Sequence, residues 1–142
     1  MAVRFLYSGS PGRKHSSPLQ EILLSAYFAF EQTSPAGDVR QFVIKLDDTA
    51  KIDEARRILA GAEPPRVHVQ GTIVARAAAY NSGWSFHLDP KTIGFFEMQI
   101  EVCDANVTYV EDHLDEVGGS FLPRSFWCPW SSRLSREVTW PP

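Results

Sequence analysis

The chain has 142 residues, enough for one domain with a substantial core. Its 44% apolar and 22% charged residues are ordinary for a soluble globular protein. The formal net charge of −3 argues against a nucleic-acid-binding protein, because such a protein would carry a basic face. No stretch approaches the ~20 consecutive apolar residues that span a bilayer, so no transmembrane segment is predicted.

Residues 1–38 are predicted to form a flexible leader or a signal-like segment, and residues 39–142 a single domain. The first part of the leader is rich in Ser, Gly, Pro and basic residues and has no hydrophobic period. The apolar run Ile22–Phe30 has two interpretations. It is either the apolar region of a secretion signal with a small-x-small cleavage site at Ser34–Ala36, or part of a short amphipathic helix over Leu19–Phe30.

The domain begins with three predicted elements. Phe42–Leu46 is a compact β-rich run and is predicted to be a strand. Residues 49–60 are predicted to form a helix, because N-cap oxygens from Asp48 precede apolar residues at helical spacing and Gly61 supplies the stop. Val67–Val74 is rich in β-branched residues and predicts a second strand.

Alternation predicts two more strands. Trp84–Leu88 alternates strictly, with its apolar residues on one side. Phe95–Val102 alternates in the same way. The residues of this strand that we expect to face the core are Phe96, Met98, Ile100 and Val102.

Residues 106–117 are predicted to form a second helix, which Gly118 ends, and Arg133–Val138 a short edge strand within an otherwise irregular tail. The sequence therefore predicts an α+β domain: an antiparallel sheet of about four strands, two helices packed on one of its faces, and an irregular C-terminal tail.

Cys103 and Cys128 are predicted to form a disulfide, because turn-rich segments flank them and no CxxC pair or third thiol indicates zinc or redox catalysis. Closing this loop would stabilise the fold by about 3–4 kcal/mol. In a cytosolic protein both residues would instead be unpaired small core residues.

Phe126, Trp127 and Trp130 form an aromatic cluster next to Cys128. Together with Arg124 they are the candidate binding surface, because ligand platforms and protein interfaces use tryptophan in this way. The alternative, which is the more frequent use, is that the rings seal the core around the disulfide.

His87 and His113 are candidates for a metal or polar cluster with Glu101 and Asp112, which would make the protein a metal-binding protein or a hydrolase. No HExxH motif or glycine-flanked serine elbow supports this chemistry. Histidines of this kind are more often structural, so no cofactor is predicted.

Carboxylates crowd the end of the second predicted helix, where the helix dipole favours cations. They are Glu111, Asp112, Asp115 and Glu116. Three interpretations stay open: a solvated face, ion pairs with arginines of the tail, or a site for a hard cation such as calcium.

Four segments carry a resemblance to a known family. They are WSFHLDP (84–90), FFEMQIEVCDA (95–105), YVEDHLDEVGG (109–119) and WCPWSSRL (127–134). The chain resembles, over roughly residues 40–138, a family of small, mostly bacterial proteins related to the N-terminal domain of an amoebal calmodulin-binding protein. Many members look like exported proteins, so the resemblance implies export. It supplies no catalytic residues, and calmodulin binding is not carried over because the chain lacks the basic amphipathic helix of a calmodulin target.

These observations predict a secreted, disulfide-stabilised binding module without enzymatic activity, located in the extracellular space or the periplasm. Its partner is an unknown protein or small ligand. One alternative is the metal-binding protein or hydrolase based on His87 and His113, and a cytoplasmic location would favour it. A second alternative is an inhibitor of extracellular enzymes that inserts the proline- and tryptophan-rich loop 120–132.

Overall fold

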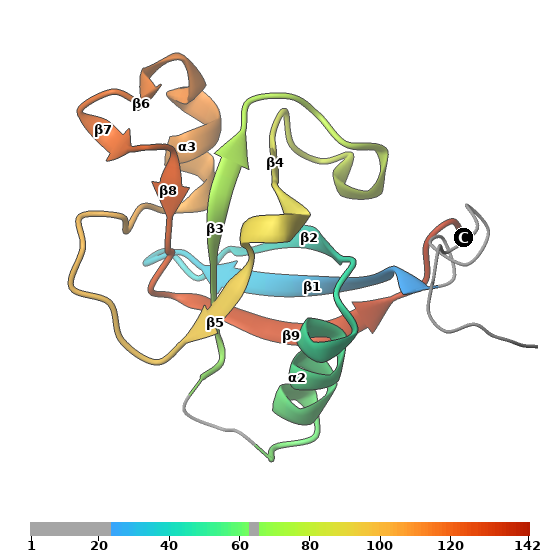
Figure 1. Ribbon diagram of the computed structural model, residues 1–142. Helices are drawn as coiled ribbons and strands as arrows, with labels where there is room; N and C mark the ends of the chain where they lie inside the picture. The colour runs from blue at the N-terminus through green and yellow to red at the C-terminus, as the bar shows by residue number, and fades with distance from the viewer. Residues whose placement is uncertain (1–23, 63–65) are drawn as a thin grey trace, which may run out of the picture.

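Strand β1 (Ala26–Thr33) is the centre of a three-stranded antiparallel sheet in the computed structural model, which describes residues 24–62 and 66–142 (Figure 1). Strand β2 (Val39–Leu46) pairs with β1 along its whole length, and β9 (Ser132–Val138) pairs with its other edge. Phe28 and Phe30 of β1 are fully buried. The apolar run of β1 is therefore the middle of the sheet.

The predictions of a leader and of a helix in this segment are wrong for Ala26–Thr33, which belong to the folded domain. A short apolar run fits a buried strand as well as a helix, and periodicity alone does not separate the two. Cleavage after Ala36 would remove the central strand. The part of the predicted leader before Leu24 lies outside the described residues.

Helix α2 (Thr49–Leu59) confirms the first predicted helix. Asp48 Oδ1 accepts a hydrogen bond from the Ala50 amide at 3.0 Å, as expected of an N-cap. On the outer side, the Arg56 guanidinium donates two hydrogen bonds to the Glu137 carboxylate of β9. This contact holds the pKa of Glu137 below its usual value, although partial desolvation opposes the shift.

Strand β3 (His68–Val74) organises the second sheet and confirms the second predicted strand. Its antiparallel partners are short: β4 (His87–Leu88), β5 (Gly94–Phe96) and β8 (Phe126–Trp127). Two further short strands, β6 (Val117–Gly118) and β7 (Phe121–Pro123), pair with each other in parallel. Single-turn 3₁₀ helices lie at Ala79–Asn81, Pro90–Thr92 and Leu114–Glu116.

The predicted strand Phe95–Val102 ends at Phe96, and its outer half is not buried. Strand β5 loses its partner there, because the Val67 carbonyl before β3 accepts a hydrogen bond from the Leu134 amide of β9 at 3.0 Å. The exposed fractions are 70% for Met98, 94% for Ile100 and 86% for Val102. The prediction that these three residues face the core is therefore wrong.

The two sheets cross and share one core (Figure 1). Trp127 of β8 is fully buried and lies 5.9 Å from the Phe30 ring, 5.4 Å from the Phe42 ring and 5.6 Å from the Phe86 ring, measured between centroids. Ser132 of β9 adds a polar link, because its hydroxyl accepts a hydrogen bond from the Val69 amide of β3.

Helix α3 (Val107–Asp112) is shorter than the predicted helix 106–117, because the backbone leaves the helical region at His113 and continues as a 3₁₀ turn. Figure 1 shows α2 below and α3 above the β1 sheet as drawn, so the expectation of two helices on one face is not confirmed. The protein is a mixed fold of antiparallel sheets and few helices. Within the described residues no helix has the length and apolarity of a membrane span.

Removing residues 1–36 is expected to abolish folding, because it deletes the strand that holds β2 and β9 together. A chain that begins at Leu24 is the control, since it keeps every described strand. Far-ultraviolet circular dichroism and urea unfolding measure the outcome. A cooperative unfolding transition in the chain that lacks residues 1–36 would contradict the central position of β1.

Candidate functional site

Cys103 and Cys128 form a disulfide, with 5.2 Å between their Cα atoms. The prediction of this pair is confirmed. The Cys128 amide also donates a hydrogen bond to the Cys103 carbonyl at 2.8 Å. Together with Phe96, the two buried cysteines form a small second core, against which Phe126 packs. The disulfide therefore joins the segment that follows β5 to the end of β8.

The predicted aromatic surface divides into a buried and an exposed part. Trp127 lies in the core and its indole Nε1 donates a hydrogen bond to the Ala105 carbonyl at 2.8 Å, so it is not a surface residue. Trp130 is 37% exposed and packs edge-on against Phe96. Phe126 is half-buried, and the predicted platform is reduced to its outer members.

Residues 97–102, called here the disulfide loop, lie between β5 and Cys103. The polar residues of this loop turn toward the protein: Gln99 Nε2 donates a hydrogen bond to Gln70 Oε1 at 2.6 Å, and Glu101 pairs with Arg124 at 3.1 Å. The apolar residues between them face solvent. Anchors at both ends and two polar contacts thus hold an apolar ridge outward.

The turn that carries Arg124 has an unusual backbone. Leu122, Arg124 and Ser125 have φ values of 48°, 61° and 61°, a region that residues other than glycine rarely occupy. Such conformations cost about 1–3 kcal/mol each and occur preferentially at functional sites. A shallow pocket of about 250 Å³ lies between this turn and the end of the disulfide loop.

The two predicted site histidines have separate structural partners. His87 Nδ1 lies 2.6 Å from the Arg76 carbonyl oxygen. His113 Nδ1 lies 2.8 Å from the Tyr109 carbonyl oxygen, and its ring stacks on the Tyr109 ring with centroids 3.9 Å apart. Each imidazole is therefore held by its own part of the chain.

The carboxylates of the predicted metal cluster are also dispersed. Glu101 is paired with Arg124 in the disulfide loop, and Asp112 is exposed on α3. Glu111 accepts hydrogen bonds from the amide and the hydroxyl of Ser85 at 2.9 and 2.6 Å, so it fixes α3 to the segment before β4. Among residues 24–62 and 66–142, no group of three or more His, Cys, Asp or Glu side chains is arranged to hold a metal ion. The predicted cluster of His87, His113, Glu101 and Asp112 is not formed.

The largest pKa shift with a clear cause belongs to Tyr80. Burial, together with the nearby Tyr27, Asp47 and Asp89, raises the pKa of its phenol to about 12. The group stays protonated at neutral pH, and Tyr80 packs against Tyr27 at 5.3 Å between centroids. This shift reflects packing and indicates no catalytic acid or base.

A pocket of about 310 Å³ at the start of α2 holds charged groups that already have partners. Asp47 pairs with Lys45, Asp48 caps the helix, and Lys51 pairs with Glu54. This pocket is not a site of unmet polar groups.

A third pocket, of about 280 Å³, lies where the tip of the β1–β2 hairpin meets the start of α3. It includes Gln32 and Arg40, which the sequence analysis did not single out; Gln32 was assigned to the leader. No local motif marks these residues, because two strands and a helix bring them together.

Two comparisons with known proteins give no match: neither the curated proteins nor the solved structures contain one. The scan of family models gives one result, the family of the N-terminal domain of a calmodulin-binding protein, which matches residues 24–141. The match confirms the relation that the sequence motifs predicted. It also includes β1, in agreement with the fold.

Reducing the disulfide is expected to lower the free energy of unfolding by about 3.5 kcal/mol, because the reduced unfolded chain regains the entropy of the closed loop. Urea unfolding of the oxidised and the reduced protein measures the difference. A variant with Cys103→Ser and Cys128→Ser is the control, and reductant should leave its stability unchanged. Equal stability of oxidised and reduced wild-type protein would contradict this role.

Trp127→Ala is expected to destabilise the protein by about 3–5 kcal/mol, because it empties the centre of the core. Trp130→Ala is the matched control and should cost no more than about 1 kcal/mol, since its ring is partly exposed and packs on few neighbours. Urea unfolding midpoints of the two variants decide the matter. Similar losses for both would place the two indoles in equivalent environments.

Proposed function

Since the chain belongs to the family of the N-terminal domain of a calmodulin-binding protein, we propose that it is a secreted binding module, stabilised by its disulfide, that contacts a protein partner through the disulfide loop. The observation that carries the proposal is the exposure of Met98, Ile100 and Val102 on a loop that is anchored at both ends. Large apolar side chains grouped in this way mark interaction sites.

The disulfide loop offers a partner both side chains and backbone. Within the described chain, the backbone groups of Met98, Gln99 and Ile100 form no hydrogen bond with other backbone groups. A partner with an apolar cleft and an open strand edge would therefore satisfy these groups and cover the apolar ridge at the same time. Because the loop is already fixed at both ends, less conformational entropy is lost when it binds.

Secretion is supported by the disulfide. Such bonds persist in the extracellular space and the periplasm and are rare in the cytosol. The Cys103–Cys128 bond is buried and closes a separation of 25 residues, as expected of a structural disulfide. We propose an extracellular or periplasmic location for this reason.

The second candidate function is inhibition of an extracellular endopeptidase, and the disulfide loop would be the inserted segment. The earlier candidate, loop 120–132, contains strands β7 and β8 and the buried Trp127, so most of it is not free to insert. The disulfide loop presents apolar side chains outward at alternate positions, as a bound substrate does. Titrating endopeptidases with apolar specificity tests this function: Ile100→Asp should abolish inhibition, and rapid cleavage within the loop would identify a substrate.

A photo-crosslinking amino acid at Ile100 is expected to give a discrete adduct with a protein in the medium or periplasm of the native host. The same amino acid at Val39 is the control, because this residue is also apolar and 57% exposed but lies on β2. The adduct at position 100 should be lost when Met98 and Val102 are replaced by Ser. Adducts from both positions, or cytosolic protein with both thiols free, would contradict the proposal.

A further inference from the structure

The pocket between the tip of the β1–β2 hairpin and the start of α3 is distinct from the disulfide loop and shares no lining residue with it. We propose that this pocket binds a small α-amino carboxylate, such as a free amino acid. A buried amide and two unpaired charges support this ligand, and neither observation depends on the proposed protein-binding function.

Gln32 is 3% exposed and lines the pocket. Its Oε1 accepts a hydrogen bond from the Val107 amide at 2.7 Å, which fixes the orientation of the carboxamide, because an NH₂ group cannot accept from that donor. In the described part of the chain the Nε2 group has no hydrogen-bond partner. A buried donor without an acceptor costs about 1–3 kcal/mol, so its two hydrogens call for an acceptor in the pocket.

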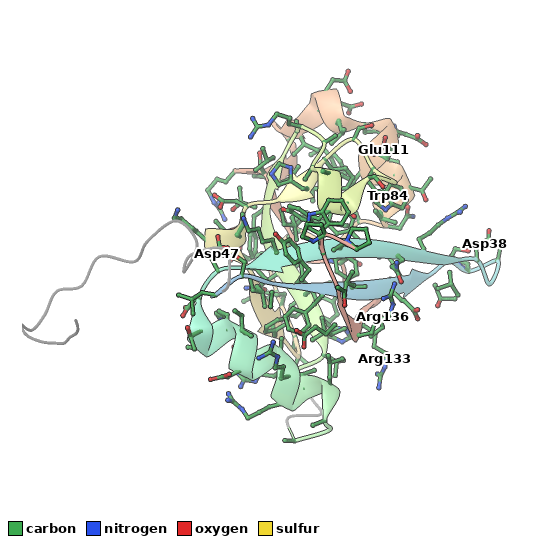
Figure 2. All side chains as sticks on the ribbon, turned by 90° about the vertical axis from the view of Figure 1, so that its right-hand side faces the viewer. Asp38, Asp47, Trp84, Glu111, Arg133 and Arg136 are labelled. Atoms are coloured by element: carbon green, nitrogen blue, oxygen red, sulfur yellow. A yellow bond between two sulfur atoms is a disulfide. The ribbon has the colours of Figure 1, made fainter. Side chains whose placement is uncertain are left out.

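Arg40 is the cross-strand neighbour of Gln32 in the β1–β2 ladder, which places both side chains on the same face of the sheet. Its guanidinium forms no ion pair or hydrogen bond with any described residue, and the Asp38 carboxylate at the hairpin tip forms none either. Figure 2 shows Asp38 at the end of the hairpin, away from the body of the protein. One pocket thus holds two opposite charges that do not pair with each other.

The side of the pocket formed by α3 adds further donors. Asn106 Oδ1 accepts a hydrogen bond from the Tyr109 amide at 2.8 Å, so the amide nitrogen of Asn106 is its remaining polar end. The Thr108 hydroxyl also lines the pocket. Amide, guanidinium and hydroxyl donors therefore outnumber the one carboxylate.

This set of groups matches a zwitterion. A ligand carboxylate accepts from the Gln32 amide and pairs with the Arg40 guanidinium, which suits a planar carboxylate. The ligand ammonium group pairs with Asp38. The volume of about 280 Å³ is near the lower end for ligand pockets, so it suits a molecule of the size of an amino acid. An anion without an amino group would leave Asp38 unpaired.

The test is titration of the full chain with free L-amino acids, followed by nuclear magnetic resonance of the side-chain amide groups. A subset of the amino acids should shift the Gln32 and Asn106 NH₂ signals, and acetate or methylamine alone should not. Calorimetry then gives the dissociation constant of the best amino acid. If no amino acid shifts these signals, or if acetate binds as tightly as the amino acid, the proposal is wrong.

Two variants connect the binding to the pocket. Arg40→Gln should weaken binding about tenfold or more, because it removes the charged partner of the carboxylate. Arg133→Gln on β9 is the matched control and should leave the dissociation constant unchanged. Gln32→Glu keeps an acceptor for the Val107 amide but replaces the donor with a carboxylate oxygen, so it should abolish binding in a folded chain. Equal binding by the Arg40 and Arg133 variants would overturn the assignment. So would binding of a peptide carboxyl terminus in the absence of amino acid binding.

Discussion

The burial of Trp127 is the constraint on which the rest of the structure depends. Its ring contacts Phe30 and Phe42 of the first sheet and Phe86 of the segment before β4, so one indole holds two sheets and a loop together. Strand β8 has only two residues and could not position this ring alone. The disulfide at the next residue, Cys128, and the indole hydrogen bond to the Ala105 carbonyl hold it in place.

Elements specified by local signals were predicted well. Helix α2 has an N-cap at Asp48 and a buried face at helical spacing, and both signals lie within the segment itself. Strand β1 was missed for the opposite reason. Its identity depends on pairing with β2, which follows closely, and with β9, which lies about a hundred residues away. The run Ala26–Phe30 carries no local feature that distinguishes a central strand from a helix.

The candidate site shows the same limit in another form. The sequence predicted the disulfide correctly, but Trp127 and Trp130 have nearly the same neighbours along the chain, and only the tertiary fold buries one of them. The alternation of Met98, Ile100 and Val102 was interpreted as burial. Alternation shows that one side of an extended segment is apolar, but the partner strand decides whether that side is covered. Since β3 has no free edge beyond His68, the apolar side faces solvent.

The fold also bears on calmodulin binding, which the description of the related protein suggests. A calmodulin target presents a helix with a free apolar face and basic residues around it. Helix α2 has the basic residues, but Ile52, Ala55 and Ile58 of its apolar face are buried against the core, and Arg56 is tied to Glu137 of β9. Helix α3 has no basic residue in its last turn and is only six residues long. Neither described helix can enter calmodulin without unfolding the domain, so the surfaces left for recognition are the disulfide loop and the pocket at the hairpin tip.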